Sequence, residues 1–216
     1  LIMHLEPEKI SYADLLKFDD DKRYELIDGV PYLMASPSVA HQEIVGEIYY
    51  QLKTYLKGKK CRVFISPLDV KLSGAIDNNE EFNVVQPDIM VVCDKDKITE
   101  KNIVGAPDLA IEILSPSNIR HDRMRKLKLY QKFGVREYWM VSIEEQNIMV
   151  LTLSEEGIYQ IAEACYLDEK VKVNVLDNCF VDLKEFCENN NIVVEKSKEY
   201  LELMAEEAKE KEEKQQ

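Results

Sequence analysis

Two apolar stretches decide the fold of this chain, Asp88-Ile89-Met90-Val91-Val92-Cys93 and Leu109-Ala110-Ile111-Glu112-Ile113-Leu114. Strands that are buried on both faces of a sheet have this nearly continuous apolar composition. Residues 119–133 follow with helical periodicity and end before Gly134, a residue type that commonly terminates helices. The only tryptophan, Trp139, lies in a further expected strand at residues 137–141. The sequence therefore predicts buried strands with a helix between the last two.

Shorter elements extend outward from this centre. Asp28-Gly29 predicts a tight hairpin turn, and Ser11 is a typical N-cap for a short helix that ends near residue 18. Residues 39–57 are amphipathic, with His41 at the centre of the apolar face. We expect the remaining strands at residues 24–27, 30–34, 62–65, 69–72, 148–153, 159–164 and 171–175, and a short helix near Leu183.

The composition changes at Glu195, after which Glu and Lys crowd a segment that has few apolar residues. This pattern predicts a charged helical tail. We therefore divide the chain into one domain at residues 1–190 and a tail at residues 191–216. No apolar run reaches the roughly 18 residues that span a bilayer, so we expect no membrane association.

The chain of 216 residues is acidic, with 28 Lys and Arg against 41 Asp and Glu and a net charge of −13. This excess argues against a protein that coats nucleic acid with a broad basic surface. Residues 117–136 form a basic island, in which we assign Arg120, Arg123, Arg125 and Lys128 to the binding of a polyanion. The alternative is a helix face that is simply solvated.

The five cysteines include no C-x-x-C pair, so the sequence predicts neither a disulfide framework nor a zinc ribbon. Cys93 ends an apolar run, and we expect it to be a small buried hydrophobe. A reducing cytoplasm is the compartment that this cysteine usage favours.

Glu112 is the only charge in a stretch that otherwise belongs to the core. A buried carboxylate without a partner costs several kcal/mol, so it should pair with a cation or a metal ion. If the two apolar stretches pair antiparallel around residue 100, Asp88 lies opposite Glu112, about 5 Å away between Cβ atoms. Asp108 competes as a ligand, but it stands four residues from Glu112, roughly 13 Å along the strand. We therefore expect Asp88 and Glu112 to share one cation.

Lys126 falls within the apolar face of the expected helix at residues 119–133, where a lysine seldom lies without a partner. Because this helix follows the strand that carries Glu112, we expect the two side chains to meet. The alternatives are a structural ion pair and a lysine that reaches the rim of the domain. Two carboxylates, a lysine and a basic rim predict phosphodiester hydrolysis with Mg²⁺ or Mn²⁺, in which the ion activates water and the ammonium stabilises charge.

Several motifs together resemble the Uma2 family of restriction endonucleases. They are Tyr24-Glu25-Leu26-Ile27-Asp28-Gly29, Pro87-Asp88, Glu112-Ile113-Leu114-Ser115-Pro116-Ser117, Asp122-Arg123-Met124-Arg125-Lys126 and Gly134-Val135-Arg136-Glu137-Tyr138-Trp139. The resemblance covers about residues 12–188 and implies an α/β (α+β mixed) fold with the PD-(D/E)XK core, a central mixed β-sheet flanked by helices. It also implies a DNA substrate and, by analogy with related nuclease cores, a homodimer.

The same resemblance assigns the metal ligands and the lysine of the site. Asp88 and Glu112 would bind the metal through their carboxylates, and Ile113 would bind it through the main-chain carbonyl. The usual lysine of the motif would stand at position 114, where this chain has Leu114. The family instead displaces the lysine onto the following helix, and Lys126 occupies that place.

Glu25 and His41 also match family positions near the site, and we count both as candidate catalytic residues. His41 could equally be a satisfied core histidine, and Glu25 could face solvent. A second hypothesis is that the chain is a catalytically silent nuclease fold that acts through a protein partner or its tail, which the net charge of −13 favours. A serine hydrolase is disfavoured because the sequence has no G-x-S-x-G motif.

Overall fold

The computed structural model describes residues 9–18, 21–114 and 119–202, and for residues 119–123 it describes the backbone only. The helices in these ranges are α1 (Tyr12–Leu15), α2 (Val39–Tyr55), α3 (Ile119–Phe133), α4 (Lys184–Asn189) and a 3₁₀ turn, η1 (Lys95–Lys97). The strands are β1 (Tyr24–Ile27), β2 (Val30–Leu33), β3 (Arg62–Ile65), β4 (Val70–Lys71), β5 (Val84–Val85), β6 (Ile89–Val92), β7 (Ile103–Val104), β8 (Leu109–Leu114), β9 (Glu137–Ser142), β10 (Asn147–Leu153), β11 (Tyr159–Tyr166), β12 (Lys170–Val173) and β13 (Cys179–Asp182). None of the helices in the described part of the chain is long and apolar enough to cross a membrane.

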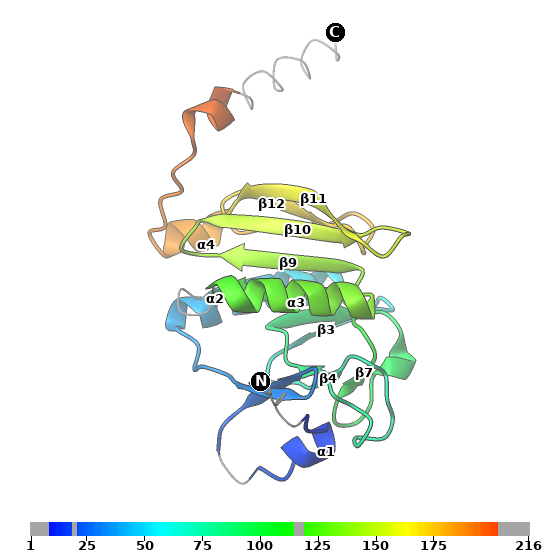
Figure 1. Ribbon diagram of the computed structural model, residues 1–216. Helices are drawn as coiled ribbons and strands as arrows, with labels where there is room; N and C mark the ends of the chain where they lie inside the picture. Colours follow the sequence, from blue (N-terminus) through cyan, green and yellow to red (C-terminus); the bar gives the residue numbers. More distant parts are fainter. Residues whose placement is uncertain (1–8, 19–20, 115–118, 203–216) are drawn as a thin grey trace.

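A six-stranded mixed sheet, in the order β11-β10-β9-β8-β6-β3, forms the centre of the molecule. β8 and β9 are its parallel pair, and α3 connects them across one face of the sheet, as Figure 1 shows. Parallel neighbours require such a crossover, because a tight turn can join only antiparallel strands. The expected mixed sheet flanked by helices is therefore confirmed.

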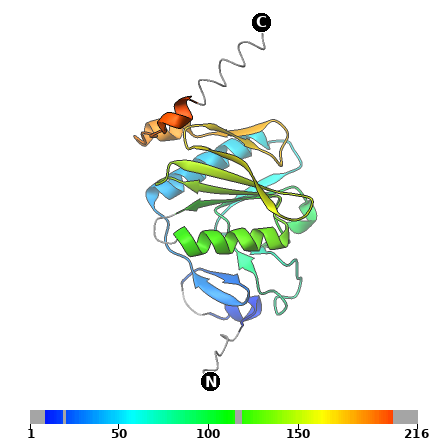
Figure 2. The same cartoon turned by 45° about the horizontal axis from the view of Figure 1, so that its top comes forward.

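Two apolar cores lie on opposite faces of this sheet, because successive strand residues point to opposite sides. Ile89, Val91 and Ile111 pack in one cluster with the buried face of α2 and with the β12–β13 ribbon. Met90 and Ala110 belong to the other cluster, which includes the buried residues of α3. Figure 2 shows α2 and α3 on different sides of the sheet.

A second sheet, in the order β2-β1-β5-β4-β7, lies beside the first. β1 and β2 form the expected hairpin, with positive φ angles of 49° at Asp28 and 80° at Gly29 that suit its two-residue turn. Pro31 lies on β2 at the edge of the sheet, where its missing N–H leaves no strand hydrogen bond unmade. Ser11 caps α1 and forms a capping box with Asp14, as its sequence position predicted.

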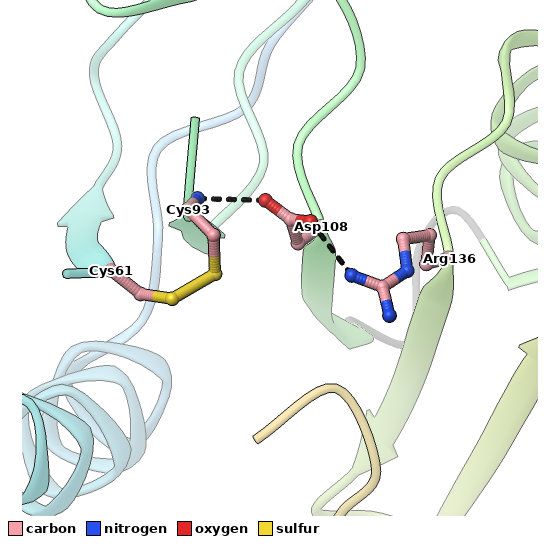
Figure 3. Close-up of a disulfide and its surroundings, with 4 residues drawn as sticks. All are labelled: Cys61, Cys93, Asp108 and Arg136. Atoms are coloured by element: carbon pink, nitrogen blue, oxygen red, sulfur yellow. Dashed lines mark hydrogen bonds and ion pairs between the residues drawn. A yellow bond between two sulfur atoms is a disulfide. The ribbon is translucent and has the colours of Figure 1, made fainter. Parts of the chain in front are cut away.

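The sequence predicts no disulfide framework, but one disulfide is present: Cys61 and Cys93 are bonded, with a sulfur–sulfur distance of 2.10 Å (Figure 3). The pairing of β3 with β6 sets Arg62 opposite Val92. Extended by one residue, this register sets Cys61 opposite Cys93, which brings the two sulfurs together. The backbone N–H of Cys93 also donates a hydrogen bond to Asp108. Cys93 is therefore a cross-strand link rather than an isolated buried hydrophobe.

The C-terminal part of the domain differs in detail from the expectation. β12 pairs with a second strand, β13, that the sequence pattern did not single out. The start of the charged tail also contacts the domain, since Lys196 forms ion pairs with Asp168 and Glu169 and the Tyr200 hydroxyl donates to Glu169. Residues 203–216 of the expected tail lie outside the described residues.

Candidate active site

Asp88 and Glu112 come together because of the register between β6 and β8. The two strands pair antiparallel, with Ile89 opposite Ile111 and Met90 opposite Ala110, so that the numbers of opposed residues add up to 200 as expected. Asp88 precedes β6 by one residue, and its Oδ2 accepts a hydrogen bond of 2.8 Å from the backbone N–H of Ile113. The predicted neighbourhood of Asp88 and Glu112 is thus confirmed, although the segment between the strands holds η1 and β7 rather than one turn.

Lys126 joins two carboxylates from different sheets. Its Nζ atom lies 2.9 Å from Glu112 Oε1 on β8 and 2.9 Å from Glu25 Oε1 on β1. All three side chains are largely buried, with exposed fractions of 14% for Lys126, 9% for Glu112 and 8% for Glu25. The expected contact between Lys126 and Glu112 is confirmed, and Glu25 faces this cluster rather than solvent.

His41 lies at the same site, in the first turn of α2. Its Nε2 atom is 3.2 Å from Asp88 Oδ2, and both side chains are 15% exposed. Ser38 caps α2 by accepting a hydrogen bond from the backbone N–H of His41. The helix start therefore positions the imidazole against the carboxylate.

These five residues line one cleft of about 800 Å³. Arg23 and Arg125 also line it, as do the hairpin β1–β2 and the segment that leads into α2. The cleft is bounded by both sheets and by α2 and α3, which explains how residues far apart in sequence reach one place. It combines buried charges with access from solvent, as sites of chemistry do.

The charges of the cluster perturb one another strongly. Burial raises the pKa of Glu112 to about 7, and the nearby Asp88 and Glu25 carboxylates add to this rise, while Lys126 and Tyr130 oppose it. Burial alone would lower the pKa of Lys126, but the surrounding carboxylates outweigh it and hold that pKa well above its usual range. The ammonium therefore keeps its proton, whereas one carboxyl group exchanges its proton near neutral pH.

The donor atoms of the cleft suit a hard divalent cation. No three His, Cys, Asp or Glu side chains of the described residues are arranged to hold a metal. The ligands that the sequence resemblance implies are two carboxylates, Asp88 and Glu112, and the Ile113 carbonyl. Mg²⁺ is commonly bound by only one or two carboxylates together with waters and phosphate. Within the described residues, the hydrogen bonds to Glu112 end on Oε1, which leaves Oε2 for a cation. The residues present therefore fit Mg²⁺ or Mn²⁺.

Asp108, the competing ligand in the sequence, is engaged elsewhere. Its Oδ2 accepts a hydrogen bond of 2.7 Å from the backbone N–H of Cys93, and its Oδ1 lies 3.1 Å from Arg136 (Figure 3). Neither Asp108 nor Arg136 lines the cleft. The preference for Asp88 over Asp108 agrees with this placement.

The basic island is only partly exposed. Arg125 lines the cleft and places its guanidinium 4.0 Å from the centre of the Tyr32 ring. Lys128 is exposed on α3. The side chains of Arg120 and Arg123 lie outside the described residues. Lys126 points inward, so the island is not a uniform solvated helix face.

Two tyrosines at the floor of the site escaped the sequence reasoning. The Tyr130 hydroxyl donates a hydrogen bond of 2.6 Å to Glu112 Oε1, and Tyr138 lines the cleft. Both side chains are completely buried, and their rings meet edge to face with centres 5.0 Å apart. Tyr130 stands four residues after Lys126 and therefore lies on the same face of α3, so the sequence spacing could have identified it as a site residue.

Comparisons with known proteins bear on the family and on the fold. A family model described as "Uma2: Putative restriction endonuclease" matches residues 11–183. The protein slr1290 of Synechocystis sp. is 27% identical over 156 residues, which are 71% of this chain and 79% of that protein. A crystal structure from Anabaena variabilis, titled as a putative nuclease belonging to DUF820, superposes with a TM-score of 0.62 at 22% identity. That likeness covers 82% of this chain and 98% of the other, and it supports the fold.

Proposed function

The chain belongs to the Uma2 putative restriction endonuclease family, and from this premise we propose that it is a Mg²⁺- or Mn²⁺-dependent DNA endonuclease. One observation carries the proposal: the Lys126 ammonium bridges Glu112 and Glu25 at 2.9 Å each, in the cleft that Asp88 also lines. A buried lysine among carboxylates from separate elements is costly to build, and perturbed groups of this kind concentrate at catalytic sites.

The roles of the residues follow from their protonation and position. Asp88, Glu112 and the Ile113 carbonyl would hold the cation. When bound there, Mg²⁺ would supply Lewis-acid chemistry: it would polarise the phosphoryl group and lower the pKa of the attacking water. Lys126 keeps its proton because its pKa is held well above the usual range, so it acts as a donor that orients water or offsets phosphorane charge and not as a base.

Glu25, His41 and Arg125 have positioning and binding roles. Glu25 Oε1 accepts hydrogen bonds from Lys126 and from the backbone N–H of Gln86, so it fixes the ammonium relative to the segment that leads into β6. His41 lies against Asp88 and orients that carboxylate. Arg125, at the wall of the cleft, is placed to meet a DNA phosphate.

The test is cleavage of supercoiled plasmid with Mg²⁺ or Mn²⁺. Glu112→Gln and Lys126→Met should each lower the cleavage rate by at least about 10²-fold, since each removes a group that stabilises the transition state. Glu43→Gln is the matched control, because Glu43 is an exposed carboxylate on α2 and does not line the cleft. Equal cleavage by all four proteins would point to a contaminating nuclease and refute the assignment.

The alternative is a silent nuclease fold that acts by binding a protein partner. The net charge of −13 favours it, as does the small number of side-chain ligands in the described part of the cleft. Partner binding that survives Asp88→Ala, together with no cleavage of any nucleic acid, would select this alternative.

A further inference from the structure

A second group of cations lies far from the candidate site, at the end of α2. Residues 53–62 contain five basic residues and no acidic residue: Lys53, Lys57, Lys59, Lys60 and Arg62. All five are exposed. None of them forms an ion pair with a carboxylate among the residues that the structure describes. We call this group the 53–62 patch.

Three cations in and just after α3 behave differently. Lys126 is bound between carboxylates, Lys132 lies 3.2 Å from Asp28, and Arg136, just after the helix, lies 3.1 Å from Asp108. The described carboxylates do not neutralise the 53–62 patch, although Lys59 and Arg62 lie over the rings of Tyr55 and Phe64, so its positive charge can act on a ligand from outside the chain.

The patch is hollowed and carries an aromatic surface. Lys53, Lys57, Lys59 and Arg62 line a depression of about 580 Å³ together with Tyr50. Tyr50 is 66% exposed, so its ring is accessible to a ligand. Cations that surround an exposed ring combine phosphate attraction with base stacking, which is how unpaired nucleic acid is bound.

We propose that the 53–62 patch is a second nucleic-acid site, which binds a single strand through its phosphates and stacks one base on Tyr50. It lies about 18 Å from His41 along α2, measured from His41 to Lys53 at 1.5 Å per residue. The disulfide between Cys61 and Cys93 fixes the end of the patch to β6. The inference goes beyond the proposed cleavage, and it depends on the proposed function only in taking nucleic acid as the class of ligand.

The test measures binding without cleavage, in EDTA, by fluorescence anisotropy of a labelled oligothymidylate. The triple variant K57A/K59A/K60A should bind at least about tenfold more weakly at low salt, and its slope of log K against log salt should fall by about 2, since each phosphate contact contributes about 0.7 for single strands. Tyr50→Ala should weaken binding by about 5- to 100-fold and leave the slope unchanged. The control K9A/K101A/K184A removes the same charge from three other exposed lysines and should bind like the parent protein.

Two outcomes overturn the inference. Equal losses in both triple variants would mean that only net charge matters. Tighter binding of a duplex of the same length, with no effect of Tyr50→Ala, would remove the single strand as the ligand. Because metal is absent from the assay, a protein that binds as expected yet never cleaves plasmid would refute the proposed function and leave the patch standing.

Discussion

Two buried tyrosines allow a sharp test of how the site is held together. Tyr130 and Tyr138 are both completely buried and in contact with each other. The Tyr130 hydroxyl donates to Glu112, whereas the Tyr138 hydroxyl has no hydrogen-bond partner among the described residues. Replacement of either residue by phenylalanine removes one oxygen from the same environment, so any difference between the variants reports the hydrogen bond.

The expected magnitudes follow from the charge of the acceptor. A hydrogen bond to a charged group contributes about 1.5–3 kcal/mol to stability, so Tyr130→Phe should lower the free energy of unfolding by about 2 kcal/mol. Tyr138→Phe should change it by less than about 0.5 kcal/mol or raise it, because an unpaired buried hydroxyl is itself unfavourable. For a domain of this size the gap corresponds to roughly 4–8 °C in Tm.

The effect of Tyr130→Phe should also depend on pH. The Tyr130 hydrogen bond lowers the pKa of Glu112, which burial raises to about 7. A bond that favours the ionised form stabilises the fold above that pKa, and this stabilisation is lost as the pH falls through it. The cost of Tyr130→Phe should therefore be larger near pH 8 than near pH 5.5, by about 1 kcal/mol.

The assay is urea unfolding followed by fluorescence of Trp139, the only tryptophan, which is completely buried on β9. A double-mutant cycle with Glu112→Gln should show that the cost of Tyr130→Phe shrinks once the charged acceptor is gone. Equal destabilisation by Tyr130→Phe and Tyr138→Phe, or a cost independent of pH, would refute the view that Tyr130 acts through Glu112.

Three further predictions concern the charges and the cross-link. Because the pKa of Glu112 is raised, the free energy of unfolding of the parent protein should fall by roughly 3 kcal/mol as the pH rises from about 4.5 to 7. Glu112→Gln should abolish this pH dependence, which urea titrations across that range measure. Below pH 7, where the metal competes with the proton on Glu112, the Mn²⁺ affinity measured by calorimetry should increase by up to about tenfold for each unit of pH increase. Asp88→Asn should weaken Mn²⁺ binding at every pH. Reduction of the bond between Cys61 and Cys93, 32 residues apart, should cost about 3–4 kcal/mol, and the double serine variant should be insensitive to dithiothreitol in the same unfolding assay.

The register of the central strands was predictable because one charged residue in an apolar strand restricts which pairings are possible. Glu112 interrupts an apolar stretch, and only a limited set of pairings can give a buried carboxylate a partner. The alternation of strand residues then fixes which neighbours share its face. Lys126 was predictable for the same reason, since its position on the wheel of α3 pointed inward. In each case one polar residue in an apolar pattern carried the information.

The disulfide and the patch show what pattern reasoning misses. Cys61 and Cys93 are ordinary in sequence, and only the pairing of β3 with β6 makes them neighbours. An odd number of cysteines does not exclude a disulfide between two of them that paired strands bring together. The basic composition of residues 53–62 is visible in the sequence, but the depression that these residues form with Tyr50 is not. Pairings across the sheet and between surface charges are long-range properties that composition does not encode.

The carboxylate cluster itself argues for a function that needs a cation. The Lys126 ammonium pairs with Glu112 and Glu25, and Asp88 is a third carboxylate near it, so the three carboxylates outnumber this ammonium whenever all are ionised. A buried arrangement of this kind is often less stable than apolar residues of similar volume. Burial raises the pKa of Glu112, and the neighbouring Asp88 and Glu25 carboxylates raise it further. A divalent cation bound at Asp88 and Glu112 would offset the excess of negative charge, so the charge of the cluster itself supports the proposed need for Mg²⁺.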